Sequence, residues 1–254
     1  SNLRIGTIMC FILGFGLYGS TFVIPLYTQQ ILGWPALDAG LLLIPSSLTT
    51  AFMMPIIGQL IQRGVKQTYM VAIGFLIFFV FTFWMHNVMT PDTSADHFFW
   101  PLIMRGVGLG LLFVPITTMA LSTLQGRSIG EGAAFTGMMR QLGGSFGIAI
   151  ISTFLTRFTQ DHRVNLVSHL DKTSFEVQQR VHQLQQGFMA KGFAPNDALD
   201  KAYKALEGGV MKQATVLSYM DIFMYLGILF LICIPFILLV RQGKGKVDMS
   251  EAMH

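Results

Sequence analysis

The chain has 254 residues, of which 52% are hydrophobic and only 12% are charged. Soluble domains carry about 25% charged residues, so this composition excludes an ordinary soluble domain and favours a membrane protein. The net charge of +4 does not indicate a nucleic-acid partner, because the basic residues lie mostly between apolar stretches instead of forming one patch. Cys10 and Cys233 fall inside apolar stretches, which excludes a disulfide framework and predicts two buried packing residues.

A helix needs about 20 predominantly apolar residues to cross a bilayer, and the chain contains six stretches that meet or approach this length. They run approximately over residues 5–29, 39–60, 69–86, 98–121, 132–154 and 216–240. Prolines at positions 25, 45, 55, 115 and 235 lie within or near these stretches, where a proline usually marks a kink. The sequence therefore predicts an all-α membrane protein with six transmembrane helices.

The short loops predict the orientation, because Lys and Arg in such loops are retained on the cytoplasmic side. The loops expected on the opposite side, residues 31–38 and 87–97, contain acids but no Lys or Arg. The basic residues of the cytoplasmic side are Arg4, Arg63, Lys66, Arg127, Arg241, Lys244 and Lys246. Both ends of this segment, including the tail 241–254, are therefore predicted to be cytoplasmic.

A long outer loop is predicted at 156–215, between the five helices of residues 1–155 and the sixth helix at 216–240. Thr173 and Glu176 have the spacing of a helix capping box, and apolar residues recur at helical intervals from Val177 to Phe188. A second short helix is expected after Asn196 and before the break at Gly208 and Gly209. These helices are interpreted either as an amphipathic cap on the protein's own outer surface or as a docking surface for another protein.

The segment from Gly143 to Gly147 matches the G-x-S-x-G pattern of serine hydrolases, but Ser145 lies in the middle of a predicted membrane helix and not at a strand-to-helix turn. An enzyme is therefore not expected. Gly143 and Gly147 are interpreted instead as a G-x-x-x-G face for close helix packing, and the glycines at 106, 108 and 110 are interpreted in the same way. H-E-x-x-H, C-x-x-C and Walker sequences do not occur, so no metal or cofactor is expected.

Ionisable residues within the apolar stretches are functional candidates, because a charge at bilayer depth is costly. Arg140 lies about 12 Å along the fifth helix, and either a structural role or a substrate or coupling role is open. Arg105 and Asp221 enter the fourth and sixth helices from the outer side at comparable depth. We expect them either to pair with each other or to face interfacial water.

The first and fourth helices also mix aromatic and hydroxyl residues, and soft walls of this kind suit ligands of varied shape. Core packing is the alternative for each of these side chains. The candidates for substrate binding or coupling are Arg140, Arg105, Tyr18, Phe22, Thr117, Met138 and Gln141.

The run from Gly58 to Lys66 resembles the cytoplasmic loop signature of the major facilitator superfamily, which joins the second and third helices of each six-helix half. Gly58, Arg63 and Gly64 match that signature. Gln62 stands where the family has an Asp, which removes the acid on which a latch role in this loop would depend. Together with Gly143, Gly147 and Asp221, the three matching residues are structural or gating candidates.

Two further runs, 114–118 and 130–147, look like the fourth and fifth helices of the C-terminal half in fourteen-helix drug:proton antiporters, the EmrB/QacA subfamily. The resemblance spans essentially the whole chain. It implies alternating access, in which two six-helix halves rock around a central cavity and exchange protons for an amphiphilic drug. The first and fourth helices would line the cavity, and the second and fifth would contact an N-terminal half that carries the proton-binding acids.

The resemblance also implies the bacterial inner membrane, and for double-membraned bacteria a periplasmic adaptor and an outer-membrane channel as partners. Two alternatives to a proton-coupled multidrug exporter remain open. One is a transporter of the same fold for a specific metabolite, lipid or siderophore. The other is a non-transporting membrane scaffold that recruits partners through the outer loop.

Overall fold

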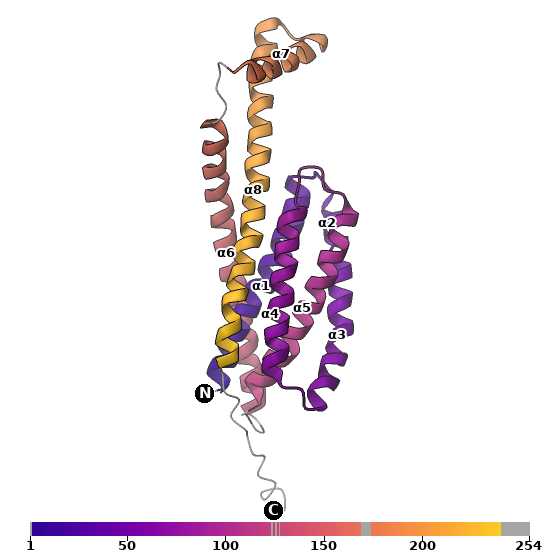
Figure 1. The fold of residues 1–254 in the computed structure, drawn as a ribbon, viewed down its shortest axis with the longest axis vertical. Helices are drawn as coiled ribbons and strands as arrows, with labels where there is room; N and C mark the ends of the chain where they lie inside the picture. Colours follow the sequence, from indigo (N-terminus) through magenta and orange to yellow (C-terminus); the bar gives the residue numbers. More distant parts are fainter. Residues whose placement is uncertain (1, 123, 125, 127, 169–173, 240–254) are drawn as a thin grey trace, which may run out of the picture.

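The computed structural model describes residues 2–122, 124, 126, 128–168 and 174–239, and in these ranges it contains helices and no strand. Figure 1 shows the helices as an elongated bundle with one end drawn out. The helices are α1 (Asn2–Gln30), α2 (Ala36–Leu41), α3 (Ile44–Gln62), α4 (Gln67–Val88), α5 (Ala95–Leu121), α6 (Ser128–Ser168), α7 (Phe175–Ala190) and α8 (Pro195–Leu239).

Six helical spans of the described chain are long and apolar enough to cross a membrane, which confirms the predicted fold class. The kinked pair α2 and α3 forms one of these spans. Pro45 lies in the first turn of α3, where its missing N–H is not needed by the helix. The third span, α4, is longer than the stretch predicted at 69–86 and has 22 residues.

The bundle is organised around α1 and α5. The most extensive contacts join α1 to α6, α5 to both α3 and α4, and α8 to both α4 and α6. Only 11% of the most apolar part of the α2–α3 span and 22% of that of α6 are buried, compared with 56% for α1 and for α5. The apolar side chains of α3 and α6 therefore face mostly outward.

Aromatic side chains fill the core between α4 and α8. The rings of Phe78 and Phe230 lie 4.5 Å apart, and Phe81 and Phe223 meet edge to face at 6.0 Å. All four residues are at most 1% exposed. Such ring pairs contribute about 0.5–1.5 kcal/mol each beyond the area that they bury.

The turn between α3 and α4 ends α3 in a Schellman motif. Gly64 has a φ of 87°, which favours glycine, and its N–H donates to the carbonyl of Ile61 at 3.0 Å. The N–H of Val65 donates to the carbonyl of Leu60 at 3.2 Å. The family-like loop is thus a helix stop that depends on Gly64, whereas a side chain at Gly58 would meet no atom within 4 Å.

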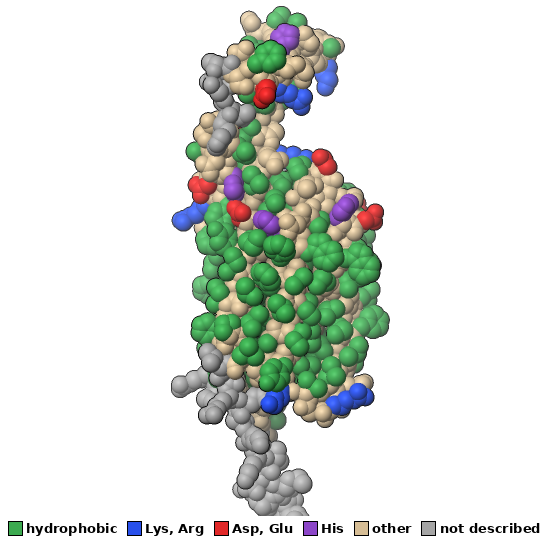
Figure 2. Space-filling model, in the orientation of Figure 1, with side chains coloured by type: hydrophobic (Ala, Val, Ile, Leu, Met, Phe, Trp, Pro, Cys, Tyr) green, Lys and Arg blue, Asp and Glu red, His purple; other side chains and the backbone are tan. Residues whose placement is uncertain are grey.

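Lys and Arg lie at both ends of the bundle on the face shown in Figure 2. At the end that carries the α3–α4 turn they occur without acids on this face, whereas beyond the apolar band at the other end acids lie together with further Lys and Arg. Arg63 and Lys66 belong to that turn. The side chain of Arg4 and the residues Arg127, Arg241, Lys244 and Lys246 lie outside the described residues. The cytoplasmic orientation stays a prediction.

The outer segment is more helical than the sequence predicts. The helix expected over 177–188 is confirmed as α7, although Thr173 lies outside the described residues. The prediction that Gly208 and Gly209 interrupt a short second helix is wrong, because α8 runs without a break from Pro195 to Leu239. Both glycines have open space around them, so they weaken the helix without ending it. In Figure 1, α6 and α8 extend past the other helices, and α7 lies at the tip of α8.

Candidate functional site

Arg105 is a fully enclosed cation that joins three helices. Its side chain on α5 is only 3% exposed. Nε donates to Ser20 Oγ on α1 at 3.0 Å, and Nη1 donates to Ser46 Oγ on α3 at 2.9 Å. Nη2 donates to the Thr21 hydroxyl and, at 3.4 Å, to the carbonyl of Leu17. Hydroxyl and carbonyl oxygens, and no carboxylate of the described chain, therefore satisfy this guanidinium.

The proposed pair between Arg105 and Asp221 is wrong. Asp221 Oδ2 lies 2.7 Å from His162 Nε2, so the acid of α8 pairs with α6. The physical reason is that α4 packs on both α5 and α8 and so lies between the two helices. The alternative for Arg105, exposure to interfacial water, is also wrong, because its side chain is buried.

Arg140 lies in a second, more open environment. Its guanidinium carbon is 4.7 Å from the centre of the Phe113 ring of α5. The residue is partly exposed, and it forms no ion pair with any described residue. A cation over an aromatic face contributes about 0.5–2 kcal/mol, more where water is excluded. Arg140 is therefore held by an aromatic ring while its hydrogen-bonding capacity remains largely open.

Glycines bring α1 and α6 into backbone contact beside Arg140. A methyl group at Gly14 would collide with the Arg140 carbonyl, and one at Gly143 would collide with the Phe11 carbonyl. A methyl group at Gly147 would lie 3.0 Å from the carbonyl of Phe15. Gly143 and Gly147 thus both lie in the α1–α6 contact, as expected of a G-x-x-x-G face.

The other candidates divide between this contact and the outside of the bundle. The Tyr18 ring lies against Gly144, and Phe22 packs against the apolar core. Thr117 is one turn from Phe113 and donates to its carbonyl at 2.7 Å. Met138 is 50% exposed and projects from the side of α6 opposite to Arg140, because two residues turn a helix by about 200°.

Gln141 is likewise exposed on α6. The structure therefore brings Arg140 to Phe113, which lies one turn from Thr117, and it places Tyr18 against Gly144, one turn from Arg140 on α6. Met138 and Gln141 are exposed on α6.

The glycines and the serine of the enzyme-like sequence patterns lie in helix contacts or bond within their own helix. The Ser145 hydroxyl donates to the Gln141 carbonyl of its own helix at 3.2 Å. A methyl group at Gly106 would lie 2.5 Å from the carbonyl of Ser46, and one at Gly110 would lie 2.8 Å from Met53. Gly106 and Gly110 therefore let α3 approach α5 at the level where Ser46 reaches Arg105.

Three polar partners are not predicted by the sequence analysis, namely Ser20, Ser46 and His162. Ser20 and Ser46 are 0% exposed, which is unusual for serine unless it is hydrogen-bonded. The sequence carries a weak signal for them, since both interrupt apolar stretches. His162 lies in a segment that the sequence assigns to a loop, so no helical register points it at Asp221.

The six apolar spans contain a buried arginine bonded to hydroxyl groups, a second arginine held over an aromatic ring, and close helix contacts at glycines. These features suit a membrane transport protein better than an enzyme. The sequence model of the Major Facilitator Superfamily matches residues 2–148. This chain belongs to the major facilitator superfamily. It is therefore a multi-pass membrane protein of a transporter family, and the family expectation from the loop at 58–66 is confirmed.

Curated relatives place the chain near drug exporters of this superfamily. It is 27% identical to the fatty acid resistance protein FarB of Neisseria gonorrhoeae over 94% of this chain and 45% of that protein. It is 23% identical to the colistin resistance protein EmrB of Acinetobacter baumannii over 96% of this chain and 46% of that protein. It is 26% identical to the multidrug export protein EmrB of Haemophilus influenzae over 87% of this chain and 42% of that protein. The likeness to EmrB is thus confirmed, and the chain spans about half the length of these relatives.

Proposed function

We propose that the chain is the C-terminal half of a proton-coupled exporter of amphiphilic compounds that works by alternating access in the bacterial inner membrane. The names of the relatives support export, since they refer to multidrug export and to resistance against fatty acids and colistin. The observation that carries the proposal is the position of Arg140. It is a partly accessible cation in an apolar span, held over Phe113 beside the α1–α6 contact.

The charge at this site favours neutral and anionic amphiphiles over cations. Arg105 and Arg140 both lie within apolar spans, and Asp221, an acid of the α8 span, is already paired with His162. A carboxylate on a ligand would form a charge-assisted hydrogen bond with the Arg140 guanidinium. A fatty acid is therefore a second candidate substrate, which agrees with the resistance named for FarB.

The exposed surfaces of α3 and α6 support a second half. Both spans are mostly unburied yet apolar, and side chains at Gly58 and Gly137 would meet open space. Unpaired apolar faces with small residues suit close packing against other helices. By the resemblance, the acids that carry protons lie in that second half. This chain alone is thus expected to give no substrate-stimulated proton flux in liposomes, and antiport by it would refute the two-half proposal.

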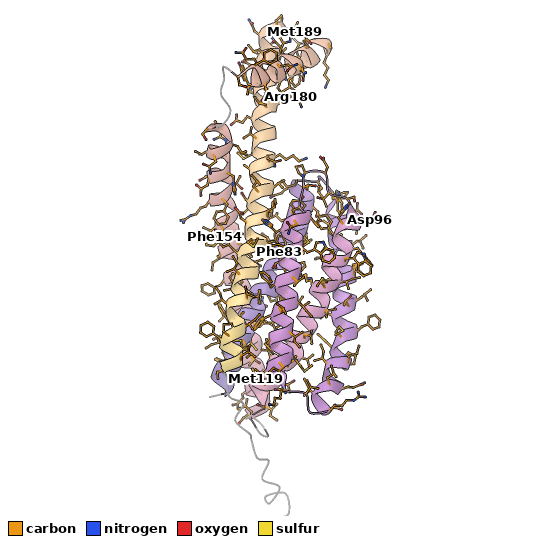
Figure 3. All side chains as sticks on the ribbon, in the orientation of Figure 1. Phe83, Asp96, Met119, Phe154, Arg180 and Met189 are labelled. Carbon is orange, nitrogen blue, oxygen red and sulfur yellow. The ribbon has the colours of Figure 1, made fainter. Side chains whose placement is uncertain are left out.

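Binding of partner proteins by the outer helices is a proposal. α7 packs on the extended part of α8 at the tip of that helix, where Figure 3 labels Arg180 and Met189, so its contacts support a cap on α8 and not on the outer end of the bundle. A periplasmic adaptor and an outer-membrane channel would approach from this end. Deleting residues 174–194 from the full-length transporter separates the alternatives: a scaffold loses its activity, whereas an autonomous antiporter still transports in vesicles.

Transport by the full-length protein in proteoliposomes tests the role of Arg140. With an imposed pH gradient, we expect Arg140→Met to abolish oleate export and to reduce export of neutral dyes less. Arg157→Met is the matched control, since Arg157 is an exposed arginine further along the same helix. Equal transport by both variants would reject the site. A stronger loss for a lipophilic cation than for oleate would reject the anionic preference.

A further inference from the structure

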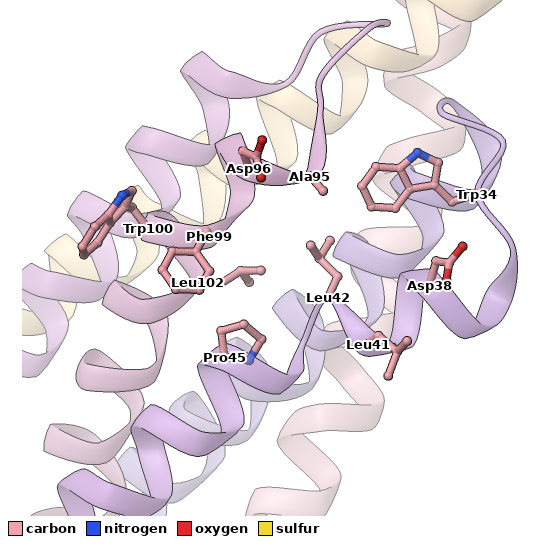
Figure 4. Close-up of a pocket in the computed structure, with 10 residues that line it drawn as sticks. All are labelled: Trp34, Asp38, Leu41, Leu42, Pro45, Ala95, Asp96, Phe99, Trp100 and Leu102. Atoms are coloured by element: carbon pink, nitrogen blue, oxygen red, sulfur yellow. The ribbon is translucent and has the colours of Figure 1, made fainter.

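A pocket of about 640 Å³ lies at the outer end of the bundle, between the start of α5 and the kinked junction of α2 and α3 (Figure 4). Its lining includes Leu41, and the apolar surface continues along α3, where Leu48 and Phe52 are 53% and 71% exposed. The second half is proposed to pack on this side of the bundle, so the pocket belongs to that interface. A site that this chain forms by itself has to lie elsewhere.

A groove of about 450 Å³ lies beyond the bundle and is lined by residues of α6, α7 and α8. On α6 the lining residue is Leu166, about 39 Å further along that helix than Arg140. It belongs to the part of α6 that extends past the other helices (Figure 1), so the groove is clear of the surface proposed for the second half. The apolar lining consists of Leu166, Leu184, Ala205, Leu206 and Val210.

Gly209 leaves open volume in this groove. α8 passes through Gly208 and Gly209 without a break, although a glycine inside a helix costs about 1 kcal/mol relative to alanine. Neither glycine serves close helix packing, because a methyl group at either position would meet no atom within 4 Å. Gly209 lines the groove and Gly208 does not. The missing side chain of Gly209 therefore provides room beside Leu206 and Val210 that the described chain does not fill.

The groove also carries one unpaired positive charge. Arg180 of α7, labelled in Figure 3, is the only charged residue among the described residues that line it. It is exposed and forms no hydrogen bond or ion pair with any described residue. Glu207, which follows Leu206, is already paired with Arg163 of α6, and the Nε of Arg163 is buried without an acceptor in the described chain. Both arginines therefore have N–H donors that lack acceptors.

We propose that this groove binds a long-chain carboxylate such as a fatty acid. The carboxylate accepts charge-assisted hydrogen bonds from Arg180, and the alkyl chain lies against Leu184, Leu206 and Val210. The volume of the groove and its mostly apolar lining with few polar groups are those of a small-molecule site.

The role of this site rests on the proposed export of anionic amphiphiles. By the predicted orientation, the groove lies beyond the outer end of the bundle. An alkyl chain released there gains about 0.8 kcal/mol for each CH₂ group that leaves water, so it tends to return to the bilayer. A groove that covers the chain opposes this return, and it thus acts as a receiving site for the exported compound.

Photolabelling of the full-length protein in lipid nanodiscs tests the proposal. The probe is a palmitate analogue with a diazirine near the end of its alkyl chain, and mass spectrometry locates the labelled peptides. We expect labels on peptides from α7 and from the outer part of α8. Arg180→Met should raise the concentration for half-maximal labelling about three- to fivefold, as expected for an exposed charge. Lys212→Met is the matched control, because Lys212 is also exposed and does not line the groove.

A pair of glycine variants tests the open volume. The side chain of Gly209→Leu should occupy the groove and weaken labelling about tenfold, whereas Gly208→Leu should leave labelling unchanged. Both changes raise helix propensity and start from positions with open space, so both variants should fold. Thermal unfolding in detergent checks that they do.

Equal labelling of the two glycine variants, or equal shifts for Arg180→Met and Lys212→Met, would overturn the groove. Equally strong labelling by the corresponding long-chain alcohol would show an unselective apolar surface and reject the carboxylate site. Labelling that depends on Arg180 and Gly209 in a protein that does not export oleate would support the groove and reject the proposed export. Export of oleate without labelling of α7 or α8 would reject the groove alone.

Discussion

The imidazole of His162 on α6 lies 2.7 Å from the carboxylate of Asp221 on α8, and this pair connects the two helices that extend furthest from the bundle. A second link lies one turn away, where Thr159 donates to Ser218 at 3.1 Å. At the same turn of α8, His86 of α4 donates to the carbonyl of Met220 at 2.9 Å. The outer part of α8 is therefore tied by side chains to two different helices.

The first prediction concerns this pair. A double-mutant cycle of His162→Gln and Asp221→Asn should give a coupling of about 0.5–1 kcal/mol in the free energy of unfolding, because both side chains are about one-third exposed. The measurement is SDS-induced unfolding of the purified protein. The matched cycle of Asp221→Asn with Arg105→Met should be additive. Coupling in the second cycle and not in the first would contradict the structure.

The second prediction concerns the hydroxyls around Arg105. Ser46→Ala should lower the free energy of unfolding by about 1–3 kcal/mol, because it leaves a buried guanidinium N–H without its acceptor. Ser47→Ala is the control, since the neighbouring hydroxyl is exposed and bonds only within its own helix. That change should stay within about 0.5 kcal/mol. Similar losses for the two variants would show that Ser46 does not support Arg105.

The number and order of the membrane helices are predictable from the sequence because the requirement for about 20 apolar residues is local and strong. The outer extensions of α6 and α8 are less visible. Beyond Phe154 and before Val216 the residues are polar, and a polar helix carries little periodic signal even when it continues an apolar one. Gly208 and Gly209 predict a break, yet the tertiary contacts of α8 with α7 and α6 override that local preference.

The candidate site was only partly predictable for a related reason. An arginine and an aspartate at similar depth suggest a pair, because opposite charge is the one long-range attraction that a sequence displays. The actual partners of Arg105 are serine and threonine hydroxyls on α1 and α3, up to 85 residues away in sequence. Hydroxyl residues are common in membrane helices and often bond to their own backbone, so nothing in the sequence distinguishes Ser46 from Ser47.

The third prediction contrasts two glycines of α6. Gly143→Ala should destabilise the protein by about 1–3 kcal/mol, because the added methyl group meets the backbone of α1 at Phe11. Gly137→Ala meets nothing within 4 Å and should stabilise this chain by up to about 1 kcal/mol through helix propensity. Thermal unfolding in detergent reports both. Destabilisation of equal size at Gly137 would show that the α1–α6 contact is not where the glycines matter.

The fourth prediction concerns orientation. Cys10 and Cys233 are buried, so replacing both with Ala gives a background for single reporter cysteines. Helix α4 separates Arg63 from Asp92 and has 22 residues, a length of about 33 Å, which is enough to cross the hydrocarbon core. In intact cells, a membrane-impermeant maleimide should label Asp92→Cys directly and Arg63→Cys only after the membrane is opened. Labelling of both from one side would remove the basis for the cytoplasmic placement of the α3–α4 turn.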